Sequence, residues 1–421
     1  MRVLVFLILA MSSLLAIDAT LEVVKRPDHT PLIVVEDGSG GESERSLSGR
    51  VYKMVIGDLK MSAHFNVQEG GIMPIEMAFE YDSYAQRKVD LVARVKTVHE
   101  RAGIVSELRL YDINSGELVL NKSYRATREE RYPFAAHKIA IDINSYIKAP
   151  SIDWMDRFVV LAKYTAPSVS QIMVADYTLT FQSPIVQDGR LNIFPKWANE
   201  QQDSIYYTKY LDEPTLFYHN LYTGESREVL KSSGMLVVSD VSDDGKKLLL
   251  TMAPQGQADI FLFDLESKAA KQLTRYRGID VSAHFVDDEE RVIFISDRLG
   301  YPNVFAAPLD GSEAVEQMVF HGRNNNAAAA FGQYIVYSSR ESSHEFENNT
   351  FNLYLVSTKS DYIRRLTASG VNQMPRFSKD GETIMYLKHS GTQSALGVIR
   401  LNYNKSYLSP LANGRIQSMD W

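Results

Sequence analysis

The chain has 421 residues, with 45 lysines and arginines against 52 aspartates and glutamates, which gives a formal net charge of −7. This balance argues against a nucleic-acid-binding protein, because such proteins present a basic surface to the phosphates. The chain contains no cysteine, which excludes a disulfide framework and a cysteine-linked lipid anchor. Its length exceeds that of one ordinary domain, so we expect two domains.

The first 19 residues have the features of a secretory signal peptide. Arg2 supplies a positive charge, residues 3–10 form an apolar run, and small residues follow up to Ala19. The apolar run is too short for a stable transmembrane span. We therefore expect cleavage after Ala16 or Ala19 and export of the chain, and the absence of cysteine suits a bacterial periplasm.

Residues 20–148 predict a small α+β domain with the order β-α-β-β-β-α. Residues 32–35 form a buried-strand run, and a polar, Gly/Ser-rich loop is expected at 38–49. Ser48 is placed to cap a helix whose apolar face is Val51, Met54, Val55, Leu59 and Phe65. Extended structure is expected from Val67, strands at 89–98, 106–111 and 117–124, and a second helix at 135–147. The linker is expected at 149–151, where a proline disfavours helix.

Residues 149–421 contain a repeat of about 44 residues, a period typical of a β-propeller blade. Each copy has an apolar or aromatic anchor, and in most copies a polar turn and a β-rich run follow. The anchors are Trp154, Trp197, Val241, Phe285, Ala330, Phe377 and Trp421. Seven anchors give six blades if the first and last share a blade, so we predict a six-bladed propeller closed by the C-terminus. A β-sandwich with coincidental spacing is the alternative.

Turn signals support this division. Asp188-Gly189, Asp244-Gly245, Asp310-Gly311, Asp380-Gly381 and Tyr222-Thr223-Gly224 are hairpin signals. The fifth blade is irregular, with an alanine run at 327–330 and a polar insert at 340–352 that is expected to be a surface loop. The loops before the innermost strands, at 231–239, 277–283, 321–326 and 368–374, should gather around one mouth of the channel. Their mixture of apolar and polar residues suits protein recognition.

Motifs for catalysis or metal binding are weak. His344-Glu345 begins a zinc-like string, but Asn348 stands where a second histidine is needed, so a solvated loop is the preferred interpretation. Asp240, Ser242 and Asp244 resemble the start of a calcium loop, but Thr251 occupies the position that requires a glutamate. A plain hairpin turn is therefore expected there. The sequence predicts no cofactor and no metal, and its nine histidines are interpreted as structural or surface groups.

Two stretches resemble the TolB family of the Tol–Pal envelope system. Residues 56–65, IGDLKMSAHF, resemble a family helix that ends in Asp-Leu-x-x-Ser-x-x-Phe. Residues 295–305, ISDRLGYPNVF, resemble the family's blade motif Phe-x-Ser-Asp-x-x-Gly-x-Pro-x-Val-Tyr. Tyr111-Asp112, Lys122-Ser123-Tyr124 and residues 131–137 fall in the family's order. The resemblance extends over nearly the whole chain.

The resemblance implies a non-enzymatic, monomeric periplasmic protein that supports outer-membrane integrity and envelope constriction at cell division. It implies that the propeller mouth binds the peptidoglycan-associated lipoprotein Pal. The positions that correspond to the family's Pal contacts are Met235, Val238 and Val281, where the family has histidine, alanine and threonine.

The resemblance also implies that a segment after the signal peptide, at about 17–26, binds the C-terminal domain of TolA. Its contact residues would be Leu21, Glu22, Val23 and Val24, and an extended strand added to a sheet edge is a reasonable mode. A propeller-type hydrolase or lyase remains the alternative, although the chain lacks the nucleophile elbow of propeller-containing peptidases.

Overall fold

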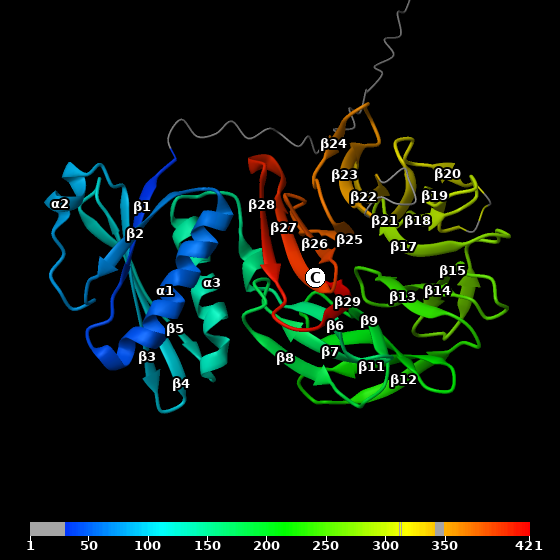
Figure 1. Ribbon diagram of the computed structural model, residues 1–421, viewed down its shortest axis with the longest axis horizontal. Coiled ribbons are helices and arrows are strands. Elements are labelled where there is room, and N and C mark those ends of the chain that lie inside the picture. Colours follow the sequence, from blue (N-terminus) through cyan, green and yellow to red (C-terminus); the bar gives the residue numbers. More distant parts are fainter. Residues whose placement is uncertain (1–29, 311, 313, 342–348) are drawn as a thin grey trace, which may run out of the picture.

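The computed structural model describes residues 30–310, 312, 314–341 and 349–421. It contains an N-terminal α+β region followed by a β-propeller (Figure 1). The predicted signal peptide, the segment with Leu21, Glu22, Val23 and Val24, and the string at His344-Glu345 lie outside the described residues, as does most of the insert in blade 5. Among the described residues, no helix is long and apolar enough to cross a membrane.

The N-terminal region is a five-stranded sheet with the order β2-β1-β3-β4-β5, in which β1 runs parallel to both of its neighbours. The strands are β1 (Leu32–Asp37), β2 (Asn66–Ile72), β3 (Leu91–Glu100), β4 (Gly103–Asp112) and β5 (Glu117–Ala126). The long helices α1 (Glu42–Ser62) and α3 (Tyr132–Tyr146) pack on one face, and the short α2 (Tyr81–Gln86) belongs to the aromatic cluster on the other. The predicted strands and second helix are present, and the extended structure expected from Val67 is β2. The region therefore has one strand more than the predicted order β-α-β-β-β-α, which also lacked the short α2.

The start of the first helix was predicted wrongly. Helix α1 begins at Glu42 after Gly41, so most of the expected loop is helical and Ser48 lies inside the helix. The hydroxyl of Ser48 donates a hydrogen bond to Asp37 Oδ1 at 2.7 Å instead of capping the helix. Leu47 lies four residues before Val51 and is buried with it, so the apolar face continues one turn further back than predicted. At the other end Ala63 has φ +67, a left-handed conformation that terminates the helix before Phe65.

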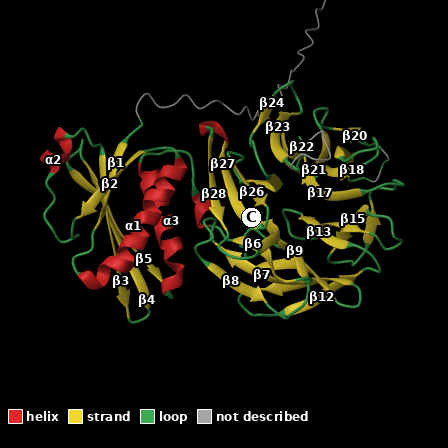
Figure 2. Cartoon of the chain, in the orientation of Figure 1, coloured by secondary structure: helices red, strands yellow, loops and turns green. Residues whose placement is uncertain are grey.

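The propeller has six blades, so the predicted fold class is confirmed. Figure 2 shows that the long helices lie in the N-terminal region and that the propeller is built mainly of strands. Blade 1 contains β29 (Arg415–Asp420), β6 (Val159–Ala166), β7 (Val169–Ala175) and β8 (Gln182–Val186). Blade 2 contains β9 (Asn192–Trp197), β10 (Ser204–Tyr210), β11 (Pro214–Asn220) and β12 (Ser226–Lys231). Blade 3 contains β13 (Leu236–Val241), β14 (Lys247–Met252), β15 (Asp259–Asp264) and β16 (Ala270–Gln272).

The remaining blades follow the same order from the channel outward. Blade 4 contains β17 (Asp280–Val286), β18 (Arg291–Ser296), β19 (Asn303–Pro308) and β20 (Glu316–Gln317). Blade 5 contains β21 (Arg323–Phe331), β22 (Tyr334–Arg340), β23 (Phe351–Ser357) and β24 (Ile363–Arg365). Blade 6 contains β25 (Val371–Phe377), β26 (Thr383–Ser390), β27 (Gln393–Arg400) and β28 (Lys405–Pro410).

The C-terminus closes the ring as predicted. The last strand, β29, pairs antiparallel with β6, so the two ends of the propeller share blade 1 (Figure 1). The rings of Trp154 and Trp421 meet edge to face, with centroids 5.9 Å apart. Trp154 itself lies in the 3-10 turn Asp153–Asp156 rather than in an innermost strand, because β29 occupies that place. Pairing the terminal strands in one sheet leaves no open edge where the ring begins.

One turn assignment was wrong. Asp188-Gly189 connects β8 to β9 and therefore joins two blades, whereas Asp244-Gly245, Asp380-Gly381 and Tyr222-Thr223-Gly224 each join paired strands of one blade. The expected insert of blade 5 is shorter than predicted, because Arg340 ends β22 and Phe351 begins β23.

Helices α1 and α3 lie between the N-terminal sheet and blades 1 and 6 (Figure 1), and their apolar faces share one core cluster with both blades. On blade 6, the Tyr407 hydroxyl donates a hydrogen bond to the carbonyl of Lys60 at 2.7 Å. The turn after β7 on blade 1 also reaches α1, where the Tyr177 hydroxyl donates to Asp58. The N-terminal region is thus attached beside the closing seam of the ring.

Candidate binding site at the propeller mouth

The end of the propeller that carries the connections from one blade to the next is called the mouth face here. The turns between the second and third strands of each blade lie at the same end. A cavity of about 110 Å³ opens there and is lined by residues from the innermost strands of all six blades. The other end, where the turn Asp244-Gly245 lies, is called the far face.

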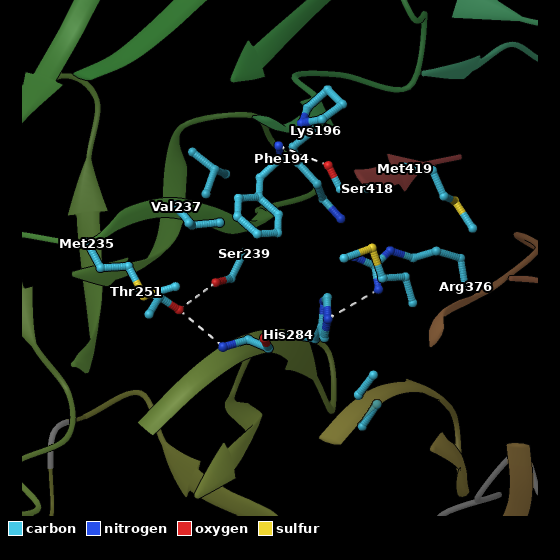
Figure 3. Close-up of a pocket in the computed structure, with 16 residues that line it drawn as sticks. Phe194, Lys196, Met235, Val237, Ser239, Thr251, His284, Arg376, Ser418 and Met419 are labelled. Atoms are coloured by element: carbon cyan, nitrogen blue, oxygen red, sulfur yellow. Dashed lines mark hydrogen bonds between the residues drawn. The ribbon is translucent and has the colours of Figure 1, made fainter. Parts of the chain in front are cut away.

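Apolar side chains form much of the cavity wall. Phe194, Met235, Val237, Met374 and Met419 lie in or directly before the innermost strands of four blades, and Figure 3 shows Phe194 and Val237 beside the cavity. Three of these side chains are methionines, which adapt to partner surfaces because they are unbranched and flexible. A concave apolar surface with polar groups below it is a typical binding site.

Hydrogen bonds between neighbouring blades fix the wall. The N–H of Phe194 in blade 2 donates to Ser418 Oγ in blade 1 at 2.9 Å. The N–H of Ser282 in blade 4 donates to Thr251 Oγ1 in blade 3 at 3.1 Å, and Ser239 and Thr251 are joined at 2.9 Å (Figure 3). Phe194, Ser282 and Met374 all have φ between +50° and +57°, so the innermost strands bend away from regular geometry at the cavity.

Five charged or titratable side chains lie at the inner end of the cavity, and Lys196, His284 and Arg376 also line it. Lys196 Nζ lies 3.0 Å from Asp420 Oδ1 and 3.1 Å from Asp240 Oδ1. Asp240 Oδ2 lies 3.5 Å from His284 Nδ1, and His284 Nε2 lies 3.3 Å from an Arg376 guanidinium nitrogen (Figure 3). Arg376 Nε lies 3.1 Å from Asp420 Oδ1, which completes a closed circuit. We call these five residues the channel ring.

The channel ring holds its carboxylates charged and its histidine neutral. Burial by itself would raise the pKa values of Asp240 and Asp420, but Lys196 and Arg376, together with hydrogen bonds to the carboxylates, outweigh burial and lower both pKa values. Burial, together with the charge of Arg376, lowers the pKa of His284 to about 4 despite the nearby Asp240. With neutral His284, two cations balance two carboxylates, so the floor of the cavity has no net charge.

The repeat aligned in the sequence contains the signal for this ring. Lys196, Asp240, His284, Arg376 and Asp420 each immediately precede an anchor residue. The sixth equivalent position, before Ala330, is Ala329, and the contact between His284 and Arg376 bypasses that blade. Asp420 and Asp240 also accept hydrogen bonds from the N–H groups of the anchors Trp197 and Phe285 in the next blade. The ring therefore links blades to one another.

The three predicted Pal-contact residues have different surroundings. Met235 is 39% exposed and lines the cavity. Val238 also lines the cavity, but it is only 4% exposed, because it packs in the core shared by blades 2 and 3. Val281 packs against the core between blades 4 and 5, and it does not line the cavity. Of the four loops expected around the mouth, 231–239, 277–283 and 368–374 contribute lining residues, and Ala327 follows directly after 321–326.

The calcium-like segment is a hairpin turn, as preferred from the sequence. Ser242 and Asp244 bond to each other and to the N–H groups of Lys247 and Lys246, within the turn between β13 and β14. Asp240 faces the channel instead, where it pairs with Lys196. Among the described residues, no group of three or more metal-ligating side chains is found.

A second buried network, which the sequence did not predict, joins the N-terminal region to the propeller. His137 Nδ1 on α3 lies 2.8 Å from Asp58 Oδ2 on α1, and its Nε2 lies 3.5 Å from Asp176 Oδ2 on blade 1. All three side chains are buried, and the Tyr177 hydroxyl also donates to Asp58. Burial by itself would lower the pKa of His137, but the charge of Asp58 and the nearby Asp176 outweigh it and raise the pKa to about 10. His137 is therefore a buried cation.

Comparisons with known proteins give a consistent result. A family model for the TolB amino-terminal domain matches residues 19–119, and a model for the TolB beta propeller domain matches residues 157–421. A Tol-Pal system protein TolB from Wolinella succinogenes is 75% identical over 421 residues, covering 100% of both chains. Proteins of the same name from Helicobacter hepaticus and Campylobacter jejuni are 49% and 44% identical, and the alignments cover at least 98% of each chain.

A solved structure shows the same fold. The crystal structure of TolB from Acinetobacter baumannii aligns with a TM-score of 0.74 and 20% sequence identity. The alignment covers 93% of this chain and 96% of that one, so both the N-terminal region and the propeller are shared.

Proposed function

The chain belongs to the TolB family of the Tol-Pal system, and we propose that it is a non-enzymatic periplasmic adaptor of that system. In this proposal the propeller mouth binds the periplasmic domain of the lipoprotein Pal, and a segment at about 17–26 binds the C-terminal domain of TolA. The adaptor would connect a peptidoglycan-bound lipoprotein to a partner at the inner membrane, and so support outer-membrane integrity and envelope constriction at cell division.

The observation that carries the Pal proposal is the apolar cavity on the mouth face. Its wall is held by hydrogen bonds between blades, so little ordering is required when a partner binds. The floor is charge-balanced, and each aspartate of the channel ring is already engaged by cations. This arrangement supports recognition of an apolar projection of a partner rather than the hydrolase or lyase alternative.

The structure indicates which predicted contact to test. Met235 offers exposed surface at the cavity, whereas Val238 is buried and a carboxylate placed there would disturb the core. We expect calorimetric titration with the periplasmic domain of the organism's own Pal to show binding that Met235→Asp weakens by about tenfold or more. Met77→Asp is a matched control, because Met77 is 52% exposed and lies in the N-terminal region. Equal loss in both variants, or no binding by the unmodified protein, would contradict the proposal.

The TolA proposal is tested by removing the segment. A chain lacking residues up to 26 should keep its thermal unfolding midpoint, because the proposal assigns this segment to partner binding. It should also keep Pal binding but lose binding to the C-terminal domain of TolA. Substitution of Leu21, Val23 and Val24 by serine should have the same effect in the full-length mature chain, whereas retained TolA binding in both forms would rule out this segment as the site.

A further inference from the structure

A group of exposed apolar side chains lies on the mouth face beside the cavity, at blade 4. Phe320 is 82% exposed, Ile279 is 52% exposed and Leu299 is 45% exposed. They lie in the connections that precede β21 and β17 and in the turn between β18 and β19, respectively. All three connections end on the mouth face by the topology of the blades. We call these three residues the blade-4 ledge.

The segments that carry the ledge are fixed to one another. The N–H of Ile279 donates to Asp297 Oδ1 at 2.8 Å, and Arg298 contacts Asp280 at 3.1 Å. Gly278 allows this approach, because a Cβ there would lie only 2.1 Å from Asp297 Oδ1. The N–H of Asn325 donates to the carbonyl of Pro302 at 2.8 Å, which ties the segment after Phe320 to the turn that contains Leu299. A rigid apolar surface binds a partner at low entropic cost.

The charges around the ledge are mainly positive. Residues 275–280, 297–302 and 320–323 contain four arginines and two aspartates. Asp280 is neutralised by Arg298, and Asp297 is engaged with the N–H of Ile279. Among the described residues, no carboxylate forms an ion pair with Arg275, Arg277 or Arg323. The Arg323 guanidinium lies 5.9 Å from the ring of Tyr301 instead.

The far end of the same blade has the opposite charge. The connection between β17 and β18 is Asp287-Asp288-Glu289-Glu290, four acidic residues in sequence. A partner with an acidic docking surface would therefore be attracted to the mouth end of blade 4 and repelled from its far end. This polarity, together with the exposed apolar group, distinguishes the ledge from the charge-balanced cavity next to it.

We propose that the blade-4 ledge is a principal contact surface for the lipoprotein's periplasmic domain, and that the partner's docking surface has an apolar centre bordered by carboxylates. This inference rests on the proposed Pal binding. It assigns the contact to Ile279, Leu299 and Phe320 with Arg277 and Arg323, and it leaves Val281 as a packing residue beneath them. Exposed aromatic and arginine side chains are the residue types that most often dominate such interfaces.

The test is calorimetric titration of the full mature chain with the Pal periplasmic domain. Phe320→Ser should raise the dissociation constant about tenfold or more, and the double variant Ile279→Ser/Phe320→Ser should raise it further. Tyr222→Ser is the matched control, because Tyr222 is 78% exposed on the far face. It should change the dissociation constant less than about twofold, within the range of residues outside an interface.

The charge contribution is tested separately. The double variant Arg277→Glu/Arg323→Glu should associate more slowly with the Pal domain. Its dissociation constant should also rise less with salt concentration than that of the unmodified protein. Lys246→Glu, an exposed far-face substitution, should leave both quantities unchanged. Near-normal affinity of both double variants, with binding still lost in Met235→Asp, would overturn the ledge while keeping the proposed function. No binding by the unmodified protein would refute both.

Discussion

Two histidines, His137 at the interface between the N-terminal region and the propeller, and His284 in the channel ring, are both buried within networks of charge. His137 faces two carboxylates, Asp58 and Asp176, and its pKa rises to about 10. His284 faces one carboxylate and the Arg376 guanidinium, and its pKa falls to about 4. Burial acts in the same direction at both sites, so the difference comes from the charges of the neighbouring groups.

The interface network and the channel ring also have different structural roles. The interface network holds one cation between two anions and joins helices α1 and α3 to blade 1. The channel ring contains two cations, two anions and one neutral imidazole, which lies between Arg376 and Asp240. It joins five of the six blades. A change at the interface should therefore loosen the attachment of the N-terminal region, whereas a change in the ring should open the propeller itself.

The largest effect is expected from Asp420→Ala. Asp420 pairs with Lys196 in blade 2 and Arg376 in blade 6, and it lies on the strand that closes the ring. Removing it leaves two cations poorly solvated, so we expect a loss of about 3–5 kcal/mol in the free energy of unfolding. Urea unfolding, followed by tryptophan fluorescence, measures this change in the free energy of unfolding. Asp361→Ala, at an exposed far-face position, should stay within about 0.5 kcal/mol; a similar small change for Asp420→Ala would show that the ring does not stabilise closure.

A smaller but still large effect is expected from Asp58→Asn at the interface. The imidazolium of His137 then keeps only Asp176, at 3.5 Å, so we expect a loss of about 3 kcal/mol. Glu129→Gln is the control, because Glu129 forms an exposed pair with Arg50 and should contribute less than about 1 kcal/mol. If unfolding separates into two transitions in Asp58→Asn alone, the interface network couples the two regions. If both variants behave alike, His137 does not need its second carboxylate.

The fold followed from local features, but these networks did not. The period of the anchors and the turn residues predicted six blades and the closure at Trp421, because each blade repeats the same local pattern. The contact between Asp58 and His137 joins residues 79 apart on two helices, and no local pattern indicates it. The channel ring had a sequence signal, the residue before each anchor, but its meaning depends on closing six blades around one axis.

Local backbone geometry limited how well the contact residues could be predicted from the sequence. Alternation along an innermost strand should tell which residues face the channel, but bulges interrupt the pairing between Val238 and Asp240 and between Val281 and His284. Val238 and Val281 pack against the cores between blades, whereas Met235 precedes β13 and remains exposed. The start of α1 was missed for a different reason, since its first turns are polar and resemble a loop by composition.

The pH dependence of stability should distinguish the two histidines. The pKa of His137 in the folded protein lies above the usual value of 6.5, so its stabilisation is complete below pH 6.5 and is lost as the pH rises toward 10. Asp58, Asp176 and the more distant Asp156 are the carboxylates around it. Between neutral pH and pH 10 the unmodified protein should lose on the order of 3 kcal/mol of its free energy of unfolding through His137, and His137→Gln should not show this loss. An unchanged alkaline slope in that variant would mean that His137 is neutral.

The smallest effect, and the one with opposite sign, is expected from His284→Gln. The pKa of His284 in the folded protein lies below 6.5, so the unfolded chain binds the proton first and stability is lost as the pH falls from 6.5 toward 4. His64 has a similarly lowered pKa, so only the difference between the variant and the unmodified protein reports on His284. That difference should be on the order of 2 kcal/mol at pH 4 and should vanish above pH 7. A variant that instead loses stability at neutral pH would indicate that the imidazole contributes to the ring mainly through its hydrogen bonds, and the contrast with His137 would then be one of contacts rather than of charge.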